Sequence, residues 1–366
     1  MFGSEHYVPV LRGKQGEFWS LQESGDEDLE HVTPLIEVPE IPKDFDDEGE
    51  PYPAKSVDDH LKSREALFSE SLDEDQPFFL DLNLIPPGER MASGEHPNSY
   101  LLDRLREMDL TPIPVVGLGR DSEKTNASVE AARRDGHGLC VRVEDDDLED
   151  PDAVEEFLQA RAGELEQGRR DIDVIIDFGP IDPDSINALR IAALQTVRNL
   201  PQVTEWRTLT FAATAFPETL GRFGRDTRNY VPRSEWSIWL HLRDKQERLP
   251  RLPAYGDYAV NHPAIVEVDP RVMSMSANLR YTHDGQWLIY KGKDAFKHGF
   301  DQFVDFCKDL VGRPEYTGRD FSWGDDYIYR CSNDNEGPGN ATKWRQVGTT
   351  HHLAAVVDQI TNLRAP

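Results

Sequence analysis

The stretch LCVRVE, from Leu139 to Glu144, alternates aliphatic residues with residues of other kinds and ends on a charge. Alternation with a period of two is typical of a β-strand, in which Arg142 and Glu144 share one face while Val141 and Val143 share the other. The aliphatic face suits contact with covering helices. The other face brings charges to the carboxyl end of the strand, where a buried ion must be paired, hydrated or bound to a ligand.

Strands of this kind recur eight times between Tyr7 and Pro263, each followed by a polar turn and usually by a helix-like stretch. This cadence predicts an α/β fold, a (β/α)8 barrel of the TIM type. The clearest amphipathic helix runs from Asp184 to Leu200. The expected strands are YVPVL (Tyr7 to Leu11), TPLIEV (Thr33 to Val38), PFFLDLN (Pro77 to Asn83), PIPVVGL (Pro112 to Leu118), LCVRVE (Leu139 to Glu144), DVIIDF (Asp173 to Phe178), TLTFAAT (Thr208 to Thr214) and GDYAVN (Gly256 to Asn261).

Most of the expected strands end in a charged or amide residue, and the carboxyl ends of barrel strands form the face on which this fold builds its sites. We therefore expect these side chains to line one ligand-binding cleft. The insertions at residues 39–55 and 85–100 are rich in Pro and Gly and are expected to wall the same cleft. The predicted cleft residues are Lys14, just after the first strand, Glu37, Asp81 with Asn83, Arg142 with Glu144, Asp177 and Asp257.

Three arrangements of these charges remain open from the sequence. Glu37, Asp81 and Asp177 can hold a divalent cation through oxygen ligands, with Arg142 and Lys14 holding a phosphate. The same set can instead bind a polar or phosphate-bearing small molecule directly, through bidentate and point-charge contacts. In the third arrangement the charges form a buried ion-pair lattice that closes the barrel mouth.

After Pro263 the alternation of strands and helices ends. SANLRYTH and QWLIYKGK flank Asp284-Gly285, which predicts an antiparallel hairpin, and helices follow. We expect residues 1–265 to form the barrel and residues 266–366 to form a hairpin, a helix and a closing segment packed on it. Arg280, in the hairpin, is expected to line the same cleft as Asp257.

The segment GPGNATKWRQVGTTHHL, from Gly337 to Leu353, combines a Gly-rich turn with Arg345, His351 and His352. Such turns let backbone N–H groups approach an anion. We expect the segment to fold over the barrel mouth, to contribute these three residues to the pocket and to begin a helix near His351. Adjacent histidines face different ways on a helix, so they are a weak metal signal.

Composition limits the function classes. The 366 residues carry a net charge of −28, which argues against non-specific binding of nucleic acid or anionic membrane. We interpret the acidity as a well-solvated surface; the alternatives are adaptation to a salty cytoplasm and mimicry of nucleic acid. Three isolated cysteines argue against a disulfide framework or a structural zinc site. With no long apolar run, the chain is expected to be cytoplasmic.

Several segments also resemble a known family. YVPVLRGKQGEFWSL (Tyr7 to Leu21), TPLIEVP (Thr33 to Pro39), YGDYAVNHP (Tyr255 to Pro263) and the Gly337 to Leu353 segment are similar to the Beta protein family of phages, satellite phages and bacterial genomes. The resemblance implies a role in phage exclusion or toxin control, together with a protein partner from the same locus. It supplies no catalytic residues.

We therefore predict a component of an antiphage defence or toxin–antitoxin locus that binds a polar or phosphate-bearing ligand at the carboxyl face of the barrel, and a protein partner. One alternative is a metal-dependent hydrolase that acts on a phosphate ester or nucleotide. Another is an antitoxin that only binds protein. The fold does not choose between an enzyme and a binding protein, because this barrel hosts many unrelated functions.

Overall fold

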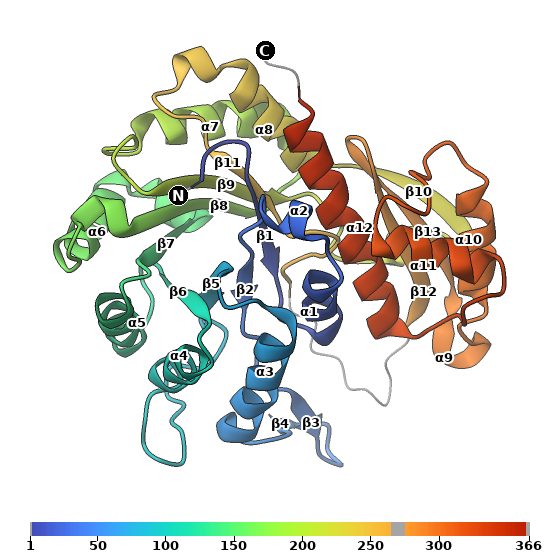
Figure 1. Cartoon of the computed structure of the whole chain (residues 1–366), viewed down its shortest axis with the longest axis horizontal. Helices are drawn as coiled ribbons and strands as arrows, with labels where there is room; N and C mark the ends of the chain where they lie inside the picture. The colour runs from blue at the N-terminus through green and yellow to red at the C-terminus, as the bar shows by residue number, and fades with distance from the viewer. Residues whose placement is uncertain (1, 265–274, 364–366) are drawn as a thin grey trace.

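Eight parallel strands close into a barrel, with helices around its outside (Figure 1). The computed structural model describes residues 2–264 and 275–363. The strand order is β1, β11, β9, β8, β7, β6, β5, β2, so the last barrel strand pairs with the first. The predicted (β/α)8 barrel is confirmed. Its strands are β1 (Tyr7–Leu11), β2 (Leu35–Glu37), β5 (Pro77–Asp81), β6 (Thr111–Val116), β7 (Leu139–Glu144), β8 (Ile172–Pro180), β9 (Thr208–Thr214) and β11 (Ala254–Asp257).

The helices between the strands form the outer layer. α3 begins after Ser56, whose hydroxyl accepts a hydrogen bond from the backbone N–H of Asp59, as expected of an N-cap. A small hairpin of β3 (Lys43–Phe45) and β4 (Pro51–Pro53) projects from the insertion after β2. The helices are α1 (Gln15–Gln22), α2 (Asp26–Leu29), α3 (Val57–Ser71), α4 (Pro97–Glu107), α5 (Ser122–Asp135), α6 (Pro151–Gly163), α7 (Ile186–Asn199) and α8 (Ser234–Asp244), with short 3-10 turns at Asp145–Glu149, Gly168–Asp171, Pro183–Ser185, Leu220–Arg222 and Gln246–Arg248.

Alternation along β7 separates two hydrophobic clusters. Val141 and Val143 belong to the large cluster between the barrel wall and the helices. Cys140 belongs to a smaller cluster that fills the barrel, together with inward residues of other strands such as Phe79 and Ile175. Arg142 shares the face of Cys140, so the barrel interior turns from apolar to charged at the carboxyl end of the strand.

The eighth strand differs from the prediction. β11 covers Ala254–Asp257, whereas the sequence predicted a strand from Gly256 to Asn261. The Asp257 carboxylate accepts a hydrogen bond from the backbone N–H of Ala259 at 2.8 Å, and Ala259 has a φ of 51°. This side-chain turn ends the strand at Asp257. It leaves Tyr258 with the residues that fill the barrel and turns the chain toward Asn261.

A second layer packs beside the barrel, on the right of Figure 1. Its hairpin turns at Asp284-Gly285 as predicted, and its sheet has the order β10, β13, β12. Sequence analysis did not anticipate β10, which leaves the barrel between β9 and α8 and pairs antiparallel with β13. The layer contains β10 (Thr227–Pro232), β12 (Ser276–His283), β13 (Gln286–Asp294), α9 (Ala295–His298), α10 (Gln302–Val311) and α11 (Trp323–Ser332).

α12 (Ala341–Thr361) lies between the barrel and this layer (Figure 1). It begins ten residues before the expected start near His351, because Asn340 caps it by accepting a hydrogen bond from the backbone N–H of Lys343 at 3.0 Å. Its first half contributes Trp344 and Val347 to the core of the layer. Its second half contributes to the outer core of the barrel with Leu353, Val356, Val357 and Ile360.

Candidate anion-binding site

Arg142 lies at the centre of a buried ion cluster at the carboxyl end of the barrel. Its Nη1 donates to Glu37 Oε1 at 2.8 Å and to Asp81 Oδ2 at 3.0 Å, and its Nε donates to Asp177 Oδ2 at 2.8 Å. The remaining nitrogen, Nη2, donates to the hydroxyl of Tyr258 at 2.9 Å, and that hydroxyl donates to Asp177 at 2.7 Å. Every nitrogen of the guanidinium group is therefore engaged.

Two more arginines complete the charge balance. Arg120 Nη1 donates to Asp81 Oδ1 at 2.9 Å, and Arg12 Nη1 lies 3.1 Å from Glu37 Oε2. Burial opposes ionisation of Asp81, but Arg120 and Arg142 hold its pKa below the ordinary value. Three guanidinium groups thus face the three carboxylates of Glu37, Asp81 and Asp177, which is the lattice arrangement of the sequence-based alternatives.

The proposed cation position is filled by a side chain. The Arg142 guanidinium group occupies the space between the three carboxylates that were candidate metal ligands. Among residues 2–264 and 275–363, no group of three or more His, Cys, Asp or Glu is arranged to hold a metal ion. Of the other predicted residues, Glu144 stays partly exposed, 4.0 Å from Arg142 Nε. The Asn83 side chain is exposed, and its backbone N–H donates to Asp81.

A cavity of about 620 Å³ opens next to this lattice, on the same face of the barrel. Its walls come from the segments that follow β1, β2, β5, β9 and β11, together with β12 and α12. The insertion after β2 lines it as expected, through Ile41, Lys43 and Phe45. Five cationic side chains border the cavity. Lys43 comes from the insertion after β2, and the other four, Arg12, Lys14, Arg280 and Arg345, we call the basic wall.

Two arginines of the basic wall converge on one amide. Asn261 Oδ1 accepts from Arg345 Nη1 at 2.6 Å and from Arg280 Nη1 at 3.1 Å, while Asn261 Nδ2 donates to Glu17 Oε1 at 2.9 Å. Glu17 is buried and lies 3.6 Å from Arg345. Burial and the neighbouring charge of Arg345 lower the pKa of Arg280 to about 9. Two like charges are therefore held side by side with one carboxylate near them.

Glycines set the close approaches that build this wall. Gly13 has a φ of 55°, and a Cβ there would lie 2.7 Å from the carbonyl oxygen of Glu37. Only glycine fits this turn, which carries Arg12 toward the lattice and Lys14 toward the cavity. A Cβ added to Gly348 of α12 would lie 3.1 Å from the carbonyl oxygen of Arg280. The small residue at this position lets α12 approach β12, so Arg345 lies near Arg280.

Lys14 adds a further positive charge. It is exposed, and no carboxylate of the described ranges lies within 4 Å of its ammonium group. Partial burial and the charges of Arg345, Arg12 and Arg280 lower the pKa of Lys14, with Glu17 acting in the opposite direction. In an acidic protein, a pocket with an excess of positive charge is suited to an anionic ligand.

Asp257 and His352 lie outside this pocket. Asp257 faces the helical layer, where its carboxylate accepts from Tyr7 at 2.5 Å, from Tyr255 at 2.8 Å and from His352 Nε2 at 3.0 Å. Burial alone would raise the pKa of Asp257, but His352 and Arg233 help to hold this pKa at about 2. The expectation that Asp257 and Arg280 line one cleft is therefore not met, because the parity of β11 turns Asp257 away from the barrel interior.

His351 belongs to the second layer. Its Nδ1 lies 2.8 Å from Asp325 Oδ2, its Nε2 lies 2.8 Å from the carbonyl oxygen of Thr282, and its ring stacks on Tyr281. His351 and His352 are both fully buried. Of the three residues expected from the closing segment, only Arg345 borders the cavity. The two histidines instead attach α12 to its neighbours on either side.

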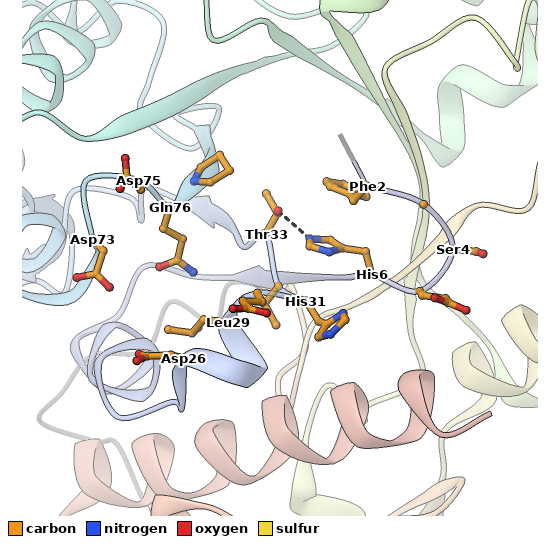
Figure 2. Close-up of a pocket in the computed structure, with 15 residues that line it drawn as sticks. Phe2, Ser4, His6, Asp26, Leu29, His31, Thr33, Asp73, Asp75 and Gln76 are labelled. Carbon is orange, nitrogen blue, oxygen red and sulfur yellow. Dashed lines mark hydrogen bonds between the residues drawn. The ribbon is translucent and has the colours of Figure 1, made fainter. Parts of the chain in front are cut away.

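A further cavity, of about 770 Å³, lies at the amino end of the barrel (Figure 2). The described residues that line it come from the segments before β1 and β2 and from the approach to β5 and its first residue. They include five carboxylates, from Glu5, Asp26, Glu30, Asp73 and Asp75, but no Lys or Arg. Figure 2 shows His6 bonded to Thr33, with the Nε2 to Oγ1 distance at 2.8 Å. Burial and His31 lower the pKa of His6 to about 3, so His6 is neutral near pH 7 and carboxylates predominate in this lining.

Comparison with known proteins agrees with the sequence resemblance. The family model described as Beta protein matches residues 7–358. The chain belongs to the Beta protein family. No curated protein sequence matches it. In the described ranges of this Beta family chain, no helix is long and apolar enough to cross a membrane.

Solved structures show a distant similarity to this Beta family chain. A chitinase from Chromobacterium violaceum ATCC 12472 has 10% identity and a TM-score of 0.30, with 98% of this chain and 99% of that chain covered. The enoyl reductase domain of MlnA, from the macrolactin biosynthesis cluster of Bacillus amyloliquefaciens, has 11% identity and a TM-score of 0.36, with 97% and 80% covered.

Five residues that shape the site were not predicted from the sequence, namely Arg12, Glu17, Arg120, Tyr258 and Asn261. Arg12 and Asn261 stand inside the segments YVPVLRGKQGEFWSL and YGDYAVNHP that carry the family resemblance, so those segments held a usable signal. Arg120 follows β6 in a loop, where strand alternation gives no information. Tyr258 shares the inward face of Gly256, whereas the prediction placed Asp257 on that face.

Proposed function

We propose that this protein binds a phosphate-bearing ligand at the basic wall and acts with a protein partner in an antiphage defence or toxin–antitoxin locus. The observation that carries the first part is the excess of positive charge beside Lys14, Arg280 and Arg345, on the face where barrels of this type build their sites. Membership in the Beta protein family, with the genetic setting that the resemblance implies, supports the second part.

Phosphate fits the chemistry of the wall. A guanidinium group presents planar, paired donors to phosphate oxygens, and an ammonium group adds a mobile point charge. Arg280 and Arg345 supply the former, and Lys14 supplies the latter. Burial, and then the repulsion between neighbouring cations, lower the pKa of Arg280 and Lys14. A bound anion would offset both effects, which gives the ligand a favourable free energy beyond its hydrogen bonds.

The ion lattice is the reason that we propose ligand binding and not metal-dependent hydrolysis. A hydrolase of that kind needs a metal with an open coordination position and an activated water. Here, Arg142 fills the space between Glu37, Asp81 and Asp177. No specific observation among the described residues favours the hydrolase.

Thermal unfolding in the presence of inorganic phosphate tests the proposed site. Excess phosphate should raise the melting temperature of the wild type, because a ligand at 100 times its Kd stabilises the native state by about 2.7 kcal/mol. Lys14→Ala should lose most of this shift. The matched control is Lys297→Ala, which removes an exposed lysine of the second layer. A shift that is absent in the wild type, or equal in all three proteins, contradicts the proposal.

The role in the locus needs a separate measurement. Cells that carry this chain with its neighbouring gene should reduce phage plating efficiency, and Lys14→Ala should abolish the reduction at an unchanged protein level. The Lys297→Ala control should protect like the wild type. Full protection by Lys14→Ala would show that the pocket is not the working part of the protein.

A further inference from the structure

We infer that the pocket takes a ligand with two linked phosphates and an apolar group, which is the chemistry of a nucleoside diphosphate. This inference rests on the proposed anion binding at the basic wall and specifies the ligand class. It draws on three properties of the cavity: its volume, the number and origin of its charges, and the composition of the lining outside the basic wall.

The volume is too large for one phosphate. At about 620 Å³ the cavity falls within the range of about 300–1,000 Å³ typical of sites for cofactors and drug-sized molecules. A single inorganic phosphate at the basic wall would leave most of that space to water. The natural occupant therefore extends beyond its first anionic group.

The charges match more than one phosphate. At the basic wall, Lys14, Arg280 and Arg345 contribute three positive charges, Glu17 removes one, and two remain, while Arg12 is balanced by Glu37. The cations project from three separate elements: the turn after β1, the strand β12 and the helix α12. Donors spread in this way can contact two phosphates in succession. A terminal phosphate carries about −1.5 to −2 charges near pH 7, and an inner phosphate adds further negative charge.

Outside the basic wall, apolar residues alternate with polar ones along the lining. This part of the lining comes mainly from the segments after β2, β5 and β9, whereas the basic wall comes from the other elements around the cavity. Phe45, on the β3–β4 hairpin, is partly exposed and offers an aromatic face. Phe216 is buried, with Arg280 stacked over its ring at 4.9 Å. The apolar contributors include Ile41, Phe45, Leu84, Pro217, Leu220 and Met275.

Glu40 and Glu218 also line the cavity. They belong to the segments after β2 and β9, which supply apolar residues, and not to the elements of the basic wall. The ligand is thus expected to place its phosphates at the basic wall and its apolar group among the aliphatic and aromatic residues. Lys43 of the insertion after β2 offsets these two carboxylates only in part, so a second anionic group is disfavoured at that end.

Calorimetric titration with four probes tests this arrangement: inorganic phosphate, pyrophosphate, ADP and the uncharged nucleoside adenosine. Pyrophosphate should bind at least about tenfold more tightly than phosphate, and ADP should bind more tightly than pyrophosphate. Lys14→Ala should weaken both pyrophosphate and ADP. Phe45→Ala, which removes a partly exposed ring, should weaken ADP by about tenfold and leave pyrophosphate unchanged.

The outcomes separate this inference from the proposed function. If phosphate and pyrophosphate bind equally, or if ADP gains nothing over pyrophosphate, the inference fails while anion binding at the basic wall stands. If none of the charged probes binds, both fail. Binding of adenosine as tight as that of ADP would also overturn the inference, because the affinity would then come from the apolar group without the phosphates.

Discussion

Replacing Arg142 by Met removes the centre of the ion lattice while keeping much of the aliphatic stem. The consequences differ among its three partners. Asp81 keeps Arg120 at 2.9 Å, and Glu37 keeps Arg12 at 3.1 Å. Asp177 loses the only guanidinium group that it contacts among the described residues and keeps the hydroxyl of Tyr258 and the backbone N–H of Gly179. The uncompensated charge therefore falls mainly on Asp177.

Removing one partner of a buried ion pair typically costs about 3–5 kcal/mol. Because two of the three carboxylates keep another arginine, we expect the lower end of this range, about 3 kcal/mol of unfolding free energy at pH 7. Urea unfolding measures it. The control is Arg228→Ala, which breaks an exposed pair with Asp309 and should cost less than about 1 kcal/mol.

A double variant identifies the cause of the loss. If the unpaired charge of Asp177 destabilises Arg142→Met, adding Asp177→Asn should recover a large part of the lost free energy, because the amide carries no charge. The deficit should also shrink as the pH falls from 7 toward 4. As the pH falls, the unpaired carboxyl of the variant binds a proton in the folded state at a higher pH than in the unfolded state. The stability of the variant therefore rises relative to that of the wild type. A loss below about 1 kcal/mol combined with lost phosphate binding would refute the lattice and make Arg142 a ligand-binding residue.

Three further outcomes are expected. Burial raises the pKa of Glu235 to about 8, above its value in the unfolded chain. Its stabilising contribution is therefore full below about pH 4 and is lost toward pH 8. Glu235→Gln should remove this pH dependence of the unfolding free energy, measured by urea unfolding between those pH values. Asp257, whose pKa is lowered to about 2, contributes about 2 kcal/mol to the unfolding free energy above pH 4, and this contribution is lost toward pH 2. Asp257→Asn should abolish this acid dependence, which urea unfolding at a series of pH values detects. Ending the chain after Arg330 removes α12 and uncovers both cores, so the product should be mostly insoluble and bind no phosphate; a soluble, folded product that binds phosphate would contradict this.

The sequence was sufficient to predict the barrel because alternation and strand spacing are local properties. LCVRVE contains both its strand period and the facing of Arg142. Local pattern also predicted that charges would gather at the carboxyl ends. It could not say whether those charges would pair with one another or bind a ligand, since pairing depends on distances between strands far apart in the chain. Glu37 and Arg142, 2.8 Å apart in space, are separated by 105 residues.

Other differences have equally specific causes. Gly256 faces a crowded interior, where a Cβ would lie 2.9 Å from the carbonyl oxygen of Val8, and this facing turns its neighbour Asp257 outward. The prediction treated Asp257 as one more strand-end charge and did not use that information. β10 was missed because TRNYVP is a short strand whose partner, β13, lies about sixty residues later, so no local signal marks the pair.

The packing of α12 explains how two like charges can stay side by side in the pocket. Arg345 and Arg280 repel each other, and a mobile side chain or a loosely packed helix would move apart to relieve the repulsion. α12 does not have that freedom. Two turns beyond Arg345, His351 bonds to Asp325 of the second layer and His352 bonds to Asp257 of the barrel. Helix packing on both sides thus maintains an arrangement that is unfavourable without an anion. Variants that loosen either histidine contact should therefore weaken phosphate binding although neither histidine reaches the pocket.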